Sequence, residues 1–288
     1  KLAITTPFSF IATASSLLWE NIKPQFVDIS ERTLCLCSKK ISEVINNETT
    51  AIVPVHVFGN ACPVNDINNL AEDNGLKVIY DASHAFGIKY EGKSILSYGD
   101  ASTISFHATK LFHTIEGGAI IFKRKEDLER ARLMINFGID GPGSIKELGI
   151  NAKMNEFQAA MGLCVLDDVD EIINKRKNVW ERYFDAFRTQ LQMQEWCSDN
   201  NNYGYFPIIF KNESNLIKVK QKLNDMNIFP RRYFYPSLNL IDVFRSFFKD
   251  MKISQSISER ILCLPIYHDL DKIIQNKIIK SIESVLCN

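Results

Sequence analysis

Short apolar runs alternate with amphipathic segments along the first half of the chain. Strands are predicted at residues 3–5, 25–28, 50–55, 77–80, 102–106 and 118–122. Helices are predicted between or after them, at residues 11–20, 39–46, 64–75 and 125–136. Strands and helices that alternate in this way are typical of the α/β class, in which helices cover both faces of a mostly parallel sheet.

The pattern changes after the last of these helices. A glycine-rich loop at residues 138–144 precedes two long predicted helices, at 154–169 and 171–192. A segment at 203–210, a helix at 214–226 and a last helix from residue 270 then suggest a smaller α+β part. We therefore predict a large domain at 1–172 and a small C-terminal domain at 173–288. Because the chain opens directly on an apolar strand, we expect the large domain to be N-terminally incomplete.

Charge and cysteine content narrow the class of protein. Lys plus Arg and Asp plus Glu both number 34, so no excess charge indicates a nucleic acid or a membrane as partner. No apolar run has membrane-spanning length, and the first residues lack the pattern of a signal peptide. The seven cysteines form no pair of CxxC motifs, which favours reduced thiols over a disulfide framework or a zinc site. We predict a cytoplasmic protein that acts on small molecules.

Chemically useful side chains collect where the predicted strands end. VIYDASHAFG places Asp81 and His84 after one strand, TISFHATK places Ser105 at the end of another with Lys110 after it, and AITTPFSF places Phe10 after the first. The carboxyl ends of parallel strands meet at one edge of a sheet, so these residues should lie together. Each has a simpler interpretation when it is taken alone. Asp81 could cap a helix, Lys110 could be solvated, His84 could be structural and Phe10 could pack in the core.

The combination favours pyridoxal phosphate as a cofactor. That cofactor needs a lysine for covalent attachment, an acid beside its pyridine nitrogen, donors for its phosphate and an aromatic face. The chain also resembles the pyridoxal-phosphate sugar aminotransferases of the DegT/DnrJ type over nearly its whole length. The blocks that carry the resemblance are TTPFSFIATASS, PVHVFGN, YDASHAFG, SFHATKLFHTIEGGAI and NAKMNEFQAAMGL, with weaker similarity in RRYFYPSL and ILCLPIYHDL. It implies the aspartate aminotransferase-like fold, called fold type I.

The resemblance also implies roles for the residues at the strand ends. Lys110 matches the lysine that binds the cofactor covalently and later moves the proton. Asp81 matches the acid that pairs with the pyridine nitrogen, and His84 matches the position beside the ring hydroxyl. Ser105 matches a hydroxyl that contacts the phosphate, and Phe10 matches the aromatic residue that stacks on the ring.

Three further residues are implied at the periphery of the site. Asn151 and Lys153, in NAKMNE, match a segment that enters the active site of the neighbouring subunit, so the resemblance implies a homodimer with shared active sites. Asn151 would contact the phosphate, and Lys153 would attract a carboxylate of the amino donor, although it could equally be a solvated lysine. Tyr235, in the aromatic run, would face the sugar or pack one domain on the other.

The expected reaction moves an amino group from L-glutamate to a nucleotide-linked keto-deoxyhexose. The most plausible acceptor is dTDP-4-keto-6-deoxyglucose, and the product would serve surface polysaccharide synthesis. A 3-keto sugar nucleotide is an alternative acceptor. Lys110 argues against the related dehydratases, in which histidine replaces the lysine. Relatives carry a further segment before the strand at residues 3–5, and the start of a helix in that segment binds the phosphate. We expect that segment to be missing here. A truncated paralogue that only dimerises or binds sugar nucleotide therefore remains an alternative.

Overall fold

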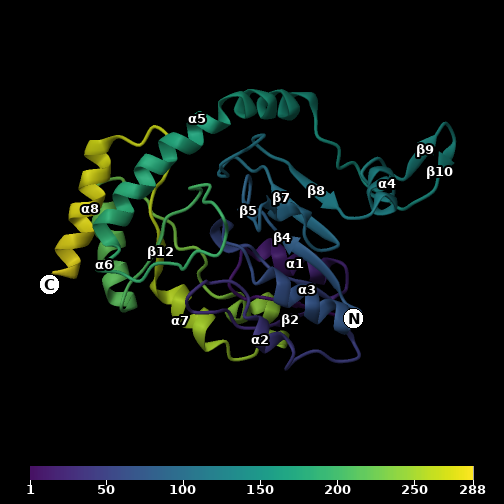
Figure 1. Cartoon of the computed structure of the whole chain (residues 1–288), viewed down its shortest axis with the longest axis horizontal. Helices are drawn as coiled ribbons and strands as arrows, with labels where there is room; N and C mark the ends of the chain where they lie inside the picture. Colours follow the sequence, from purple (N-terminus) through teal and green to yellow (C-terminus); the bar gives the residue numbers. More distant parts are fainter. Residues whose placement is uncertain (288) are drawn as a thin grey trace.

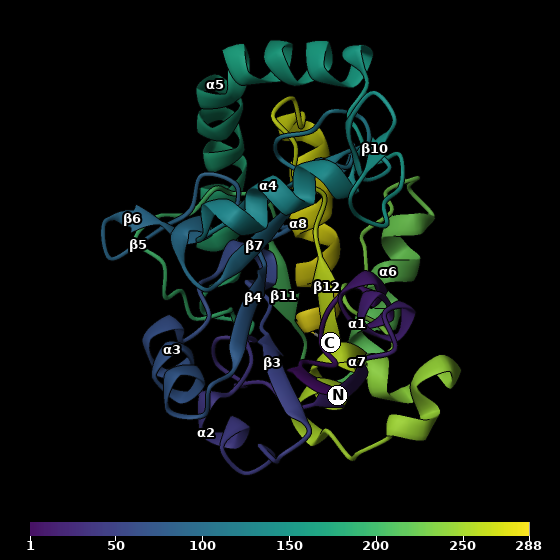
Figure 2. The ribbon, with the colours of Figure 1, turned by 90° about the vertical axis from the view of Figure 1, so that its right-hand side faces the viewer.

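The centre of the computed structural model, which describes residues 1–287, is a six-stranded sheet with the order β2-β1-β3-β4-β7-β8. Its strands are β1 (Leu2–Thr5), β2 (Lys23–Phe26), β3 (Thr49–Val53), β4 (Lys77–Asp81), β7 (Ala101–Ser105) and β8 (Gly118–Phe122). All neighbouring strands are parallel except β7 and β8. Strands β3, β4 and β7 lie side by side in Figure 2. The predicted α/β architecture with a mostly parallel sheet is confirmed.

Helices connect the strands as the alternating pattern predicted. They are α1 (Ile11–Trp19), α2 (Ser38–Ile41), α3 (Val64–Asp73) and, after β8, α4 (Lys125–Met134). The buried residues of α3 are Val64, Ile67 and Ala71, at the spacing of one helix face, and they join the large core that contains Tyr80 of β4. Single-turn 3-10 helices occur at Val57–Gly59 and Ile95–Ser97, and two small hairpins pair β5 (Lys89–Tyr90) with β6 (Lys93–Ser94) and β9 (Ile139–Gly141) with β10 (Ser144–Ile145).

One long helix, α5 (Glu156–Phe187), occupies the region where two helices were predicted. The prediction of a break near residue 170 was wrong, because no glycine or proline interrupts the chain between residues 163 and 187. A capping box of Asn155 and Gln158 starts the helix. In Figure 1, α5 arches from the neighbourhood of the β9–β10 hairpin to α6 and α8 at the opposite end of the molecule.

The C-terminal part builds a second core on the last turns of α5. Its elements are α6 (Glu213–Asn224), α7 (Lys252–Arg260), α8 (Lys272–Leu286), β11 (Pro207–Ile209), β12 (Ile261–Cys263) and the 3-10 helices Leu238–Leu240 and Asp242–Phe247. Tyr183 of α5 packs there with Leu216 and Ile278, whereas Ile257 and Ile261 belong to the core of the large sheet. The proposed boundary at residue 172 falls inside α5. No helix of the described residues is long and apolar enough to cross a membrane.

Asp28, just after β2, holds the N-terminal end of α7 on the large sheet. Its carboxylate accepts hydrogen bonds from the backbone N–H of Ile253 at 2.9 Å and of Ser254 at 2.8 Å, and from the Ser254 hydroxyl at 2.6 Å. Burial alone would raise the pKa of Asp28, but these hydrogen bonds and that of Ile29 outweigh it and lower the pKa. An ionised carboxylate therefore caps a helix that begins more than 200 residues later in the chain.

We predict that Asp28→Asn lowers the free energy of unfolding by about 2–4 kcal/mol near neutral pH, because an amide N–H₂ would face the N–H donors of α7. The pKa of Asp28 is lower in the folded than in the unfolded chain. Its contribution is therefore complete above the ordinary value of 3.8 and is lost as the pH falls through the folded-state pKa. Urea unfolding from about pH 7 down to about pH 3 should show the difference between the two proteins shrinking. A difference that stays constant over this range would contradict the assignment.

Candidate active site

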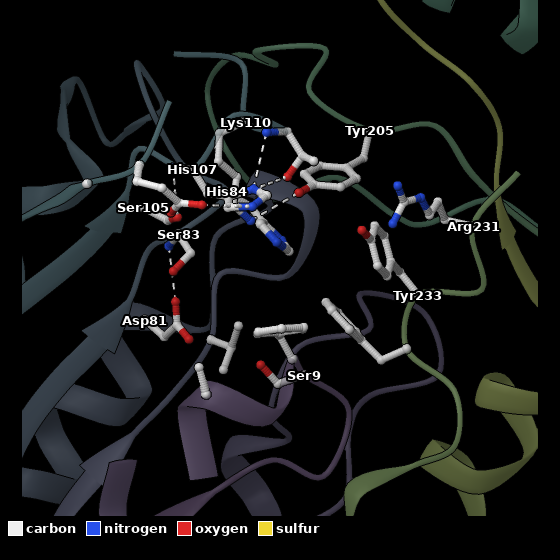
Figure 3. A pocket seen from close by; sticks show the side chains of 17 residues that line it. Ser9, Asp81, Ser83, His84, Ser105, His107, Lys110, Tyr205, Arg231 and Tyr233 are labelled. Carbon is white, nitrogen blue, oxygen red and sulfur yellow. Dashed lines mark hydrogen bonds and ion pairs between the residues drawn. The ribbon is translucent and has the colours of Figure 1, made fainter. Parts of the chain in front are cut away.

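A cavity of about 510 Å³ opens at the carboxyl ends of β1, β4 and β7. Figure 3 shows the side chains that line it. Three of the walls come from the large sheet: Ser9 and Phe10 follow β1, Asp81 ends β4, and Ser105 ends β7. The fourth wall comes from the C-terminal part and consists of Tyr205, Arg231, Tyr233 and Phe234. The residues that sequence analysis placed at the strand ends are thus brought together.

Both carboxylate oxygens of Asp81 are held by neighbouring donors. The Thr13 hydroxyl donates to Oδ2 at 2.6 Å, and the Ser83 N–H donates to Oδ1 at 3.1 Å. The backbone of Asp81 is fixed too, since its N–H donates to the Pro54 carbonyl and its own carbonyl accepts from the His56 N–H. The position of this acid in the cavity is therefore set by the sheet and by α1 together.

Lys110 lies at the opposite side of the cavity, where its amine donates to the Tyr205 hydroxyl at 3.3 Å. Burial lowers the pKa of Lys110, and the negative charge of Asp81 opposes this shift only in part. Burial also raises the pKa of Tyr205, so its phenol is neutral at physiological pH. A larger fraction of Lys110 is therefore neutral and nucleophilic than for a lysine in water.

His84 presents a neutral imidazole to the cavity. Burial lowers its pKa well below the usual range, and the positive charge of Lys110 adds to the effect. The Phe58 N–H donates to Nδ1 at 3.1 Å, so the hydrogen-bond network assigns the single imidazole proton to Nε2. The ring packs against Tyr205 with 4.4 Å between centroids. His84 can therefore donate one hydrogen bond to an oxygen of a bound molecule without carrying charge.

Ser105 and Phe10 complete the sheet side of the cavity. The His107 N–H donates to the Ser105 oxygen at 3.3 Å, which leaves the Ser105 proton available for an anion. Phe10 precedes the first residue of α1, and 59% of its surface is exposed. An aromatic face exposed on a cavity wall suits stacking on a flat ring. The alternative interpretation of Phe10 as a core residue is not supported.

Asn151, Lys153 and Tyr235 do not line this cavity. Asn151 and Lys153 are exposed, and the Lys153 amine donates to the side chain of Asn136 at 2.8 Å. The ring of Tyr235 lies against the guanidinium of Arg232, whose central carbon is 3.5 Å from the centroid of the ring. The roles predicted for these three residues stay predictions, and those of the first two require a neighbouring subunit.

Two residues that contact the key groups were missed by sequence reasoning. Thr13 touches Asp81, and Tyr205 touches Lys110, across 68 and 95 residues of chain respectively. Tyr205 lies in the segment at 203–210 and carries no signal that distinguishes it from a core aromatic. Thr13 had a weak signal. Its hydroxyl lies in the first turn of α1, which follows the end of β1, and therefore at the same edge of the sheet as Asp81.

The cavity fits pyridoxal phosphate by the chemistry of its donors. Asp81 is a fixed acid, Lys110 is a nucleophilic amine, His84 and Ser105 offer hydrogen-bond donors to oxygen atoms, and Phe10 offers an aromatic face. This set on a mostly parallel sheet defines a pyridoxal-phosphate-dependent enzyme of fold type I.

Comparisons with known proteins give the family. A model of the DegT/DnrJ/EryC1/StrS aminotransferase family matches residues 2–283. The chain is 39% identical to a dTDP-4-amino-4,6-dideoxy-D-glucose transaminase of Shigella dysenteriae, covering 98% of this chain and 79% of the relative. It is 35% identical to the Escherichia coli protein of the same name, covering 96% and 77%. Helicobacter pylori PseC, an aminotransferase in the biosynthesis of pseudoaminic acid, superposes with a TM-score of 0.89 at 25% identity, covering 99% of this chain and 79% of PseC. The chain belongs to the DegT/DnrJ/EryC1/StrS aminotransferase family, whose members use pyridoxal phosphate, and the predicted resemblance is confirmed.

Proposed function

We propose that this sugar aminotransferase moves the amino group of L-glutamate to C4 of dTDP-4-keto-6-deoxyglucose. The products are 2-oxoglutarate and dTDP-4-amino-4,6-dideoxyglucose, a precursor for surface polysaccharide. The placement of Asp81 and Lys110 in one cavity carries the proposal for the reaction type. The two relatives that are 39% and 35% identical support the choice of sugar nucleotide and of C4 over C3.

Pyridoxal phosphate supplies an aldehyde and an electron-withdrawing ring to such a reaction. The chain supplies the rest. Asp81 would provide the negative charge that keeps a pyridine nitrogen protonated, and the Lys110 amine would accept the proton that leaves the α-carbon of the amino donor and deliver it to the carbon that had carried the aldehyde. His84 Nε2–H would donate to the ring oxygen, and Ser105 would donate to the phosphate. Tyr205 accepts from the Lys110 amine and holds it within the cavity.

The wall opposite the sheet is suited to a sugar nucleotide. Arg231 is exposed at this wall, and its backbone is fixed by two hydrogen bonds to Cys263 of β12. Tyr233 and Phe234 line the same wall. A guanidinium beside aromatic faces can bind a diphosphate and an uncharged sugar ring. Contacts remote from the reacting carbon would position the keto group, so small keto acids should be poor acceptors.

We predict that the purified chain with pyridoxal phosphate and L-glutamate aminates dTDP-4-keto-6-deoxyglucose and acts much more slowly on oxaloacetate. Lys110→Ala should lower turnover by about a thousandfold or more, because the proton-transferring amine is lost. Asp81→Asn should lower it by about a hundredfold or more while leaving the shape of the cavity intact. Product is measured by mass spectrometry and its regiochemistry by NMR.

Lys93→Ala is a matched control, because it removes an exposed lysine outside the cavity and should leave turnover within about twofold of the unmodified chain. A preference for a 3-keto sugar nucleotide would contradict the regiochemistry alone. A preference for oxaloacetate would contradict the substrate class. Binding of sugar nucleotide without turnover would favour the non-catalytic alternative.

We further propose a homodimer with shared active sites. Large apolar side chains are exposed from the β9–β10 hairpin to the first turns of α5, where Leu148, Phe157 and Leu163 expose 91%, 88% and 65% of their surface. In Figure 1 this region extends away from the sheet. Several exposed apolar side chains in one stretch of the chain support an interface, and a two-fold interface would bring Asn151 and Lys153 toward the partner's cavity.

Mixing two inactive proteins tests whether the active sites are shared. We predict that Lys110→Ala and Asn151→Ala chains, each inactive as homodimers, regain activity when they are mixed under conditions that exchange subunits. One of the two sites in a heterodimer would contain both intact residues, so activity should reach about a quarter of the unmodified protein at equal mixing. Heterodimers that form, as shown by native mass spectrometry, but stay inactive would refute the proposal.

A further inference from the structure

Thr13 is buried beneath the cavity and touches the acid that the proposed function depends on. It lies in the first turn of α1, where 5% of its surface is exposed, and its hydroxyl oxygen is 2.6 Å from Oδ2 of Asp81. A contact this short with an ionised acceptor is typical of a charge-assisted hydrogen bond. Thr13 does not line the cavity, so it acts on a bound molecule only through Asp81.

The directions of the hydrogen bonds around Thr13 follow from its single hydroxyl proton. That proton is donated to Asp81. The Ser9 hydroxyl lies 2.7 Å from the same Thr13 oxygen, so Ser9 must be the donor in this second contact. Ser9 is 3% exposed. The two hydroxyls therefore form a row of hydrogen bonds that runs from Ser9 through Thr13 to the Asp81 carboxylate. In a low-dielectric interior the donors polarise one another, which strengthens each hydrogen bond.

The loop that holds Ser9 is itself anchored. The Pro7 carbonyl accepts a hydrogen bond from the Leu238 N–H at 2.9 Å, and Phe8 packs edge-on against Phe234 with 5.4 Å between ring centroids. The C-terminal part of the protein thus fixes Ser9, where the row of hydroxyl groups begins, and β4 fixes Asp81, where it ends. The plane of the Asp81 carboxylate therefore has little freedom to rotate.

From this geometry we propose that Thr13, supported by Ser9, is a positioning residue that holds the Asp81 carboxylate in the orientation in which it faces the pyridine nitrogen of the cofactor. Thr13 holds Oδ2 and the Ser83 N–H holds Oδ1, so the remaining lone pairs point to a defined place. With both oxygens held, the carboxylate accepts a further hydrogen bond, such as that of a protonated ring nitrogen, from one direction only. The inference rests on the proposed function.

The test compares Thr13→Val, which keeps the shape but removes the hydroxyl, with Thr13→Ser, which keeps the hydroxyl. The readouts are the dissociation constant for pyridoxal phosphate and the ¹⁵N NMR shift of its labelled ring nitrogen in the bound state at neutral pH. Thr13→Val should bind about 10- to 100-fold more weakly and move the resonance toward that of an unprotonated pyridine. Thr13→Ser should stay within about threefold of the unmodified chain and keep its resonance.

Further variants complete the design. Ser9→Ala, which removes only the supporting hydroxyl, should shift both readouts in the same direction by a smaller amount, about three- to tenfold in affinity. Thr13→Ala replaces Thr13→Val as the deciding variant if that protein does not fold, because Ser9 itself lines the cavity. Thr50→Val removes a hydroxyl from β3 that donates to the Leu2 carbonyl, and it should change neither readout.

The possible results separate this inference from the proposed function. An unmodified chain that does not bind pyridoxal phosphate at Lys110 overturns both. If it binds, a Thr13→Val protein with normal affinity and a protonated ring nitrogen overturns the inference alone. Equal losses in Thr13→Ser and Thr13→Val would also overturn it, since Thr13→Ser keeps the hydroxyl and its loss would then come from the packing of the side chain.

Discussion

A carboxylate held on both of its oxygens, at the end of a central parallel strand, is the constraint on which the site depends. Asp81 ends β4, whose neighbours β3 and β7 fix its backbone on either side. The first turn of α1 then reaches Oδ2 through Thr13. The right-handed crossovers of a parallel sheet place such helix starts at the carboxyl edge. The same architecture that buries the core therefore positions an acid at the cavity floor.

The burial of Lys110 follows from the same constraint. Removing an ammonium from water is costly, and here it lowers the pKa of the lysine. The negative charge of Asp81 and the hydroxyl of Tyr205 offset only part of that cost. A chain selected only for stability would expose this lysine. A buried amine opposite a fixed acid is instead the arrangement that covalent attachment of a carbonyl cofactor needs.

The sequence was informative about elements whose signal is local. Alternating strands and helices predicted the fold, and residues at the ends of strands, such as Asp81 and Ser105, could be assigned to one edge of the sheet. Contacts between distant segments carried no such signal, so Tyr205 was not anticipated. The length of α5 was misjudged, since two helices were predicted where no glycine or proline interrupts the chain between residues 163 and 187. Residues such as Asn151 depend on a second subunit, and neither periodicity nor a single chain can place them.

The central claim is that Lys110 is the residue that binds pyridoxal phosphate, and chemical trapping tests it most directly. The chain is incubated with the cofactor, reduced with borohydride, digested and analysed by tandem mass spectrometry. The account predicts a phosphopyridoxyl group on Lys110 in nearly every molecule, and its loss when L-glutamate is added before reduction, because the amine of the donor displaces the lysine. Modification spread over surface lysines such as Lys93 and Lys125, with Lys110 unmodified, would contradict the account.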